Sequence, residues 1–248
     1  MNYFKRKLHY FTKFELGLWF FSVSIIIASF FIPGKNNYLS LIASLIGATA
    51  LIFNAKGNPA GQAMMIVFGI LYSIISYSQA YYGEMITYAG MSVPMAAFSL
   101  ISWLKHPFNG NKSEVKINRI QPKELIILSA LTISVTVGFF FILKAFNTAN
   151  LIISTVSVAT SFIAVYFSFR RSPFYALGYT LNDLVLIVLW IVTSINDPSY
   201  ISVVICFCVF LFNDFYAFIC WCKRAKSQKN VEQNDTDKSV NETLSDRS

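Results

Sequence analysis

Eight long runs of apolar residues, separated by short polar segments, make up most of the sequence. A helix needs about 20 apolar residues to cross the hydrocarbon core of a bilayer, and each run approaches that length. Turn-forming residues separate the runs, as in Gly57-Asn58-Pro59 and Ser172-Pro173. The pattern therefore predicts an all-α polytopic membrane protein with eight transmembrane helices. They are expected at residues 16–33, 38–55, 60–81, 84–104, 124–143, 149–168, 173–195 and 199–222.

The composition agrees with this pattern, since 55% of the residues are hydrophobic and only 13% are charged. Such a chain is too apolar for a soluble domain with an enclosed core. The net charge of +8 by itself suggests a nucleic-acid ligand. However, the charges lie between the apolar runs and at the two ends of the chain, not in one patch. We therefore expect a lipid bilayer around the protein and no nucleic-acid partner.

Lysine and arginine are distributed very unequally between the two sides of the predicted membrane. Of the 20 basic residues, 18 fall on one side, and only Lys35 and Lys144 fall on the other. Loops that carry lysine and arginine stay in the cytoplasm, so both termini are predicted to be cytoplasmic. Adding or removing one helix would abolish the asymmetry, which supports the count of eight.

A weak internal repeat divides the chain. The segment 54–59 parallels 168–173, and Trp103-Leu104-Lys105 parallels Trp221-Cys222-Lys223. Each copy contains three spans, and the single span between them restores the orientation of the second copy, as in transporters built from parallel repeats. The tail is rich in Asn, Ser, Asp and Lys, which is typical of disorder. The predicted units are 1–37 (N-terminal segment and extra helix), 38–104 (first three-helix bundle), 105–148 (cytoplasmic loop and linker helix), 149–223 (second three-helix bundle) and 224–248 (disordered cytoplasmic tail).

Two matching polar pairs lie inside the last two apolar runs. They are Asn182-Asp183, followed by Trp190, and Asn213-Asp214, followed by Trp221. Polar groups at this depth are costly, so a functional role is the first hypothesis, and bonding between helices is the alternative. At about 100° per residue, each Asp shares a helix face with its Trp. Helical rise places both Asn residues near the middle of the membrane, which allows a site shared by the two helices.

The first half of the chain offers fewer polar candidates. Tyr72, Ser76 and Gln79 share one helix face, and Gln79 lies near the outer end of its span. The segment 81–84 is expected to belong to an aromatic belt at the outer interface. Pro94 lies in the middle of its span and predicts a kink.

The sequence contains none of the common catalytic motifs that would indicate an enzyme. The sequence lacks H-E-x-x-H, G-x-S-x-G and Walker motifs, so we expect no catalytic residue, metal or cofactor. Four cysteines in or beside the last run are interpreted as packing residues. Asp183 and Asp214 leave one alternative open, which is proton coupling of transport.

A set of short segments in both halves of the chain forms a recognisable pattern. The segments are Tyr77-Ser78-Gln79-Ala80-Tyr81-Tyr82-Gly83-Glu84-Met85, Pro94, Trp103-Leu104-Lys105-His106, Asn182-Asp183, Leu189-Trp190 and Asn213-Asp214-Phe215-Tyr216. Together they resemble the PnuC family of nicotinamide riboside transporters, and the resemblance covers roughly residues 38–223.

The resemblance implies a SWEET-like 3+1+3 core with one extra N-terminal helix, in a homotrimer of the bacterial inner membrane. It implies import of nicotinamide riboside by facilitated diffusion, followed by phosphorylation in the cytoplasm, which traps the product. Thiamine, riboflavin and deoxynucleosides remain alternative substrates, because a fold does not fix the ligand. The ring is expected on Trp190, and Asn or Gln side chains are expected to hold the amide and ribose. The predicted substrate-binding residues are Gln79, Asn182, Asp183, Trp190, Asn213, Tyr216 and Tyr72.

Overall fold

The structure is a computed structural model that describes residues 10–31, 38–78, 82–148, 150–196 and 201–245. Its elements are α2 (Lys13–Phe30), α3 (Tyr38–Ala55), α4 (Pro59–Ser78), α5 (Tyr82–Thr87), the π-helical turn η1 (Tyr88–Ser92), α6 (Val93–Lys105), β1 (Pro107–Phe108), β2 (Asn111–Val115), α7 (Pro122–Ala145), α8 (Leu151–Phe169), α9 (Phe174–Asn196) and α10 (Ile201–Ser245). Within these residues, eight helical segments are long and apolar enough to cross a membrane, with α5, η1 and α6 forming one of them. The predicted number of spans is confirmed.

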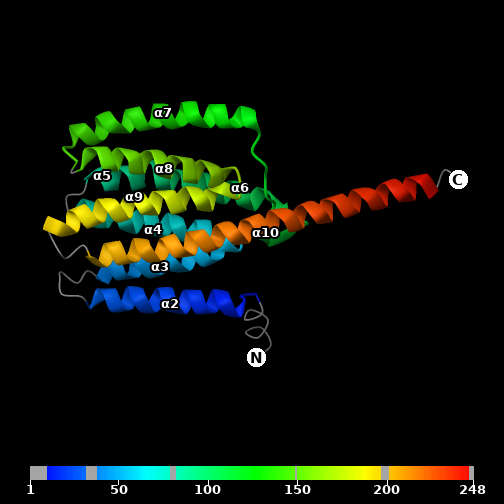
Figure 1. Cartoon of the computed structure of the whole chain (residues 1–248), viewed down its shortest axis with the longest axis horizontal. Coiled ribbons are helices and arrows are strands. Elements are labelled where there is room, and N and C mark those ends of the chain that lie inside the picture. The colour runs from blue at the N-terminus through cyan, green and yellow to red at the C-terminus, as the bar shows by residue number, and fades with distance from the viewer. Residues whose placement is uncertain (1–9, 32–37, 79–81, 149, 197–200, 246–248) are drawn as a thin grey trace.

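Six of the spans form a closed ring. Helix α3 packs on α4, and α4 packs on α6 and η1, while α8 packs on α9 and α9 packs on α10. The ring closes through contacts of α6 with α8 and of α10 with α3. Helix α2 lies outside the ring against α3 and α10, and α7 lies outside it against α8 (Figure 1). The third span of each half thus packs on the first span of the other half.

Two tryptophans at equivalent positions of the two halves stabilise these contacts between the halves at one end of the ring. Trp103 Nε1 at the end of α6 donates to the Ser168 carbonyl of α8 at 2.9 Å. Trp221 Nε1 on α10 donates to the Asn54 carbonyl of α3 at 2.8 Å. The two indole rings contact each other with centroids 5.2 Å apart, and Tyr175 packs against both. This aromatic cluster, named from here on the tryptophan cluster, fills the ring at the end that carries most of the basic loops.

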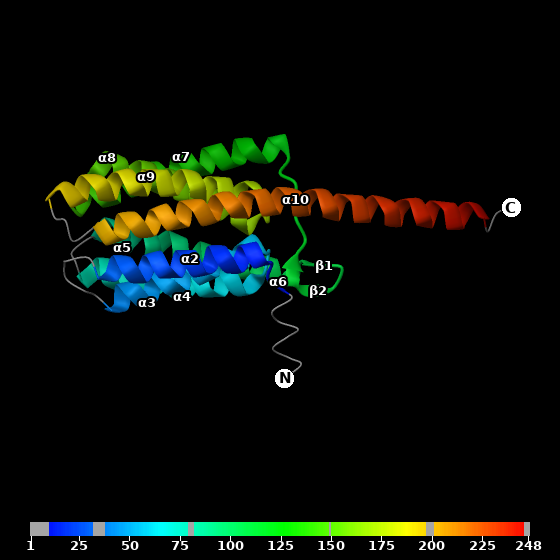
Figure 2. The same ribbon diagram turned by 60° about the horizontal axis from the view of Figure 1, so that its bottom comes forward.

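A short hairpin covers the tryptophan cluster from outside. Strands β1 and β2 pair antiparallel at the same end of the bundle (Figure 2). The fully buried Val115 packs into the cluster, and its N–H donates to the Gly57 carbonyl at 3.0 Å. Asn118 N–H donates to the Arg171 carbonyl at 3.0 Å. The loop between the halves is therefore bonded to the first interhelical turn of each half, a structure that its polar sequence did not predict.

Helix α10 continues far beyond the membrane-spanning bundle (Figure 1). It reaches Ser245, which corrects the prediction of a disordered tail at 224–248 for the residues up to that point. One reason is the hairpin, because Gln228 is buried there and its Nε2 donates to the Val115 carbonyl at 3.0 Å. Arg224 also forms an ion pair with Glu114 at 3.2 Å. The membrane span supplies the nucleus of the helix, so each added residue costs little.

The span that contains Pro94 is interrupted but not by a simple kink. The five-residue π-helical turn η1 ends at Ser92, two residues before the proline, and Val93 N–H donates to the carbonyl of Tyr88. Proline lacks the N–H that would bond the carbonyl four residues earlier. Next to it, the backbone hydrogen bonds change from a spacing of four residues to a spacing of five. The turn directs Tyr88 toward α4, where its ring packs against Tyr72 with centroids 4.4 Å apart.

Close packing of α8 and α9 depends on Gly178. A Cβ atom added there would lie 2.8 Å from Ala164 Cα, so a side chain requires the helices to separate. We expect Gly178→Val to destabilise the protein by about 1–3 kcal/mol and to lower its unfolding temperature in detergent. Gly138→Val on α7 is the matched control, because nothing lies within 4 Å of an added Cβ at Gly138. Equal unfolding temperatures for the two variants would contradict this account of the packing.

Candidate functional site

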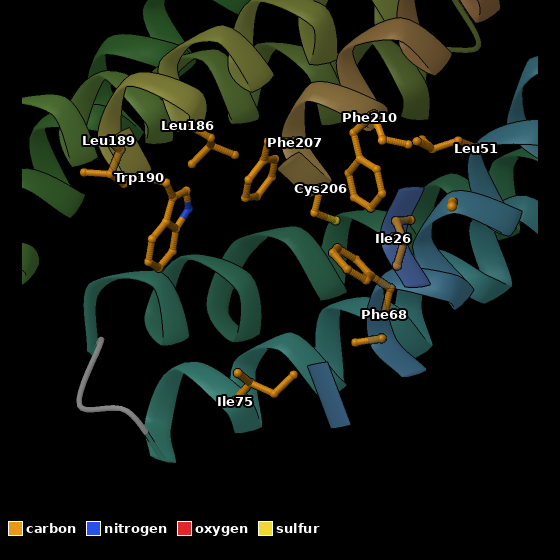
Figure 3. Packing of buried hydrophobic residues seen from close by; sticks show 13 residues of the cluster. Ile26, Leu51, Phe68, Ile75, Leu186, Leu189, Trp190, Cys206, Phe207 and Phe210 are labelled. Carbon is orange, nitrogen blue, oxygen red and sulfur yellow. The ribbon is translucent and has the colours of Figure 1, made fainter. Parts of the chain in front are cut away.

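An aromatic group lies at the centre of the ring of helices. Trp190 of α9 is 5% exposed, and its side chain interacts with Tyr72 of α4. Tyr72 packs against Tyr88 and against Phe68, with the Phe68 ring 5.7 Å away. Figure 3 shows Trp190 projecting from α9 into the core, with Phe207, Phe210 and Phe68 in the same cluster. Residues of both halves of the chain therefore supply these rings.

A cavity of 130 Å³ adjoins this group at the end of the bundle opposite the tryptophan cluster. Helix α9 contributes Leu189, Trp190 and Thr193 to its wall, and α8 contributes Ser154. The remaining lining residues come from the start of α5 and from the connection between α7 and α8; they are Tyr82, Gly83, Glu84, Phe146, Asn147, Thr148 and Asn150. The cavity is therefore walled by an indole ring, hydroxyl and amide side chains and one carboxyl group, a set that suits a small polar molecule with a flat ring.

Glu84 was expected in an interfacial belt, but the structure buries it in the cavity wall at 7% exposed. The preceding residue explains the placement. A Cβ atom at Gly83 would lie 2.5 Å from Thr148 Cγ2, so glycine allows the start of α5 to approach the α7–α8 connection. Tyr72 and Tyr88 both lie close enough to Glu84 to interact with it electrostatically. Sequence reasoning missed this residue, and the signal that could have found it is an acidic residue at the beginning of an apolar run.

The two aspartates of the Asn-Asp pairs meet between α9 and α10. Asp183 is 4% exposed and Asp214 is 3% exposed, and their side chains lie within hydrogen-bonding reach of each other. Two carboxyl groups form such a bond only when one of them holds a proton. Tyr88 and Tyr179 face the same pair. The aspartates are thus at equal depth on adjacent helices, and they continue the polar interior from Trp190 toward the tryptophan cluster.

The two asparagines turn away from this pair, because neighbouring residues on a helix differ by about 100° in direction. Asn182 is buried against α8, where its Oδ1 accepts from Thr160 Oγ1 at 2.9 Å. Asn213 is buried against α2, and its Nδ2 donates to Ser22 Oγ at 2.9 Å and to the Val209 carbonyl at 2.8 Å. Neither amide lines the cavity beside Trp190, and their convergence on one ligand stays a prediction. Each amide bonds its helix to a different neighbour.

Of the other predicted substrate-binding residues, one lies beside Trp190, one lies outside the central aromatic group and one is not described by the structure. Tyr72 adjoins Trp190, as described above. Tyr216 is half-buried on the side of α10 that faces α2, with its ring 5.1 Å from Phe14. That position is outside the central aromatic group. Gln79 falls outside the described residues. Trp190, Tyr72 and Asp183 therefore remain in the core of the candidate site, to which Glu84 and Tyr88 are added.

A metal centre finds no support in the side-chain arrangement. Among the described residues, no group of three or more His, Cys, Asp or Glu side chains is placed to hold a metal ion. Cys206 is buried in the aromatic core beside Phe207 and Phe210.

Comparison with known proteins agrees with this architecture. The family model described as nicotinamide mononucleotide transporter matches residues 37–223. A curated relative from Neisseria mucosa (strain ATCC 25996 / DSM 4631 / NCTC 10774 / M26), the nicotinamide riboside transporter PnuC, is 26% identical over 220 residues, which cover 87% of this chain and 83% of the relative.

A solved structure has the same fold. The crystal structure of the vitamin B3 transporter PnuC superimposes with a TM-score of 0.76 at 22% sequence identity, and the match covers 88% of this chain and 94% of that one. The family match includes seven of the eight spans and both halves of the helical ring. The protein therefore belongs to the nicotinamide mononucleotide transporter family and is a multi-pass membrane transport protein.

Proposed function

We propose that this chain imports nicotinamide riboside by facilitated diffusion and that phosphorylation in the cytoplasm traps the product. Membership of the family and the name of the Neisseria relative support this substrate. The observation that carries the proposal is the cavity beside Trp190, which offers an aromatic face together with polar side chains inside the membrane-spanning bundle. A flat pyridinium ring stacks on an indole, and ribose hydroxyls bond to hydroxyl and amide groups.

The membrane arrangement is part of the same proposal. The end of the bundle that carries the tryptophan cluster and most basic loops faces the cytoplasm, as the positive-inside rule predicts. The cavity then opens toward the outer side, and the tryptophan cluster closes the inner side. The reciprocal bonds of Trp103 and Trp221 support a SWEET-like 3+1+3 core, in which residues 38–104 and 149–223 form two parallel halves. We propose that three copies assemble in a bacterial inner membrane.

Uptake by proteoliposomes tests the transport function. We expect vesicles that contain the purified protein to accumulate labelled nicotinamide riboside only until the inner and outer concentrations are equal. Excess unlabelled nicotinamide riboside should compete, whereas riboflavin and deoxynucleosides should compete weakly. Thiamine also carries a cationic ring, so competition by thiamine is the most stringent test of substrate selectivity. Vesicles that take up nothing would contradict a transport function, and preferential uptake of another compound would replace the substrate.

Proton coupling is the second candidate, because the paired Asp183 and Asp214 share the interior with Tyr88. The uptake assay distinguishes the two mechanisms. We expect a pH gradient across the vesicle membrane, with the membrane potential held at zero, to leave the final accumulation unchanged, since facilitated diffusion follows only the electrochemical gradient of the substrate. Accumulation above the external concentration, driven by an inward proton gradient and abolished in Asp183→Asn, would instead establish coupling.

A further inference from the structure

Four acidic side chains are buried in the described part of the chain, and they differ in what compensates their charge. They are Glu15, Glu84, Asp183 and Asp214. Glu15 forms an ion pair with Lys56 at 2.9 Å. Asp183 and Asp214 interact with each other. Glu84 has neither kind of partner, because no Lys, Arg or His among the described residues forms an ion pair with it. A buried carboxylate without a counter-charge is costly, so a cationic ligand gains energy by approaching it.

The position of Glu84 adds a second, independent observation. Of the four buried acids, Glu84 is the one that lines the cavity beside Trp190. Its carboxyl group also lies near the rings of Tyr72 and Tyr88, whose centroids are 4.4 Å apart. Aromatic faces carry negative electrostatic potential and attract cations, most strongly where water is excluded. Glu84 and the indole of Trp190 line the cavity itself, and the rings of Tyr72 and Tyr88 lie behind them, near the carboxyl group of Glu84. This arrangement forms a receptor for a positively charged flat ring.

We propose that Glu84, together with the aromatic faces of Trp190, Tyr72 and Tyr88, selects substrates whose ring carries a positive charge. The inference rests on the proposed function and deepens it, because the pyridinium ring of nicotinamide riboside is a permanent cation. The hydroxyl and amide groups of the cavity recognise the rest of the molecule. Glu84 is therefore a specificity-determining residue, and it distinguishes cationic rings from uncharged rings of the same shape.

Two probes of nearly equal shape test the charge selection. Nicotinamide riboside is cationic, and its reduced dihydropyridine form is uncharged but keeps the ribose and the carboxamide. Calorimetric titration of the purified full-length protein should show that the wild type binds the cationic form at least about tenfold more tightly. Glu84→Gln should weaken binding of the cationic form by about tenfold or more and change the affinity for the uncharged form by less than about threefold. Glu84→Asp should retain most of the preference.

Glu114→Gln is the matched control, because Glu114 lies in the β2 strand outside the bundle and pairs with Arg224. Its affinities for both probes should equal those of the wild type. An equal loss for both probes in Glu84→Gln, or no loss for either, would overturn the charge selection. Equal affinities of the wild-type protein for the two probes would overturn it even if no Glu84 variant folds. A wild type that binds neither probe would instead refute the proposed substrate, so the two failures are distinguishable.

Discussion

Replacing Trp190 by alanine will weaken binding of nicotinamide riboside by about 30-fold or more, which corresponds to ~2 kcal/mol. The indole is the largest flat surface on the cavity wall, and it is 5% exposed, so a ring stacked on it is shielded from water. A desolvated contact between a cation and an aromatic face is worth more than an exposed one. Titration calorimetry of the purified protein measures the change directly.

Trp19→Ala is the matched control for this experiment. Trp19 lies on α2, outside the ring of helices, and its Nε1 donates to Thr49 Oγ1 at 3.1 Å. The control removes the same side chain and one hydrogen bond without touching the cavity, so its affinity for the substrate should be unchanged. A loss of less than about threefold in Trp190→Ala, under 1 kcal/mol, would show that the ring binds elsewhere.

Replacing Trp221 by alanine should have the largest effect on stability. The side chain is fully buried in the tryptophan cluster, and its removal costs about 3–5 kcal/mol through lost packing and the cavity that remains. The hydrogen bond to the Asn54 carbonyl, which fastens α10 to the first half of the chain, is lost as well. We expect a much lower unfolding temperature in detergent than for the wild type. Trp103→Ala should act similarly through its bond to Ser168.

The double variant measures how strongly the two tryptophans depend on each other. Their rings are in contact, so the loss in Trp103→Ala/Trp221→Ala should be smaller than the sum of the two single losses. Trp19→Ala should add to either variant without coupling. Unfolding temperatures of the single variants within about two degrees of the wild type would contradict a stabilising tryptophan cluster.

The transmembrane organisation follows from the sequence by itself. Apolar runs of membrane length can satisfy their backbone only as helices in lipid, so eight runs predict eight spans, and eight are present in the described residues. The sequence also identified Trp190 as a central residue and placed Asp183 on the same face, because helix geometry fixes directions within one helix. These inferences needed only local periodicity and the cost of polar groups in an apolar environment.

The tertiary structure decided which neighbour each helix face meets, because contacts between helices depend on residues far apart in the chain. Periodicity gives a direction for Asn213 but not the presence of Ser22 of α2 at that direction. It gives an acid at Glu84 but not the close approach at Gly83 that turns the start of α5 into a cavity wall. The helical tail likewise depends on a hairpin that binds Gln228. The sequence alone thus determined the number of spans and the directions of polar side chains within one helix, and packing between distant segments determined which of them share one cavity.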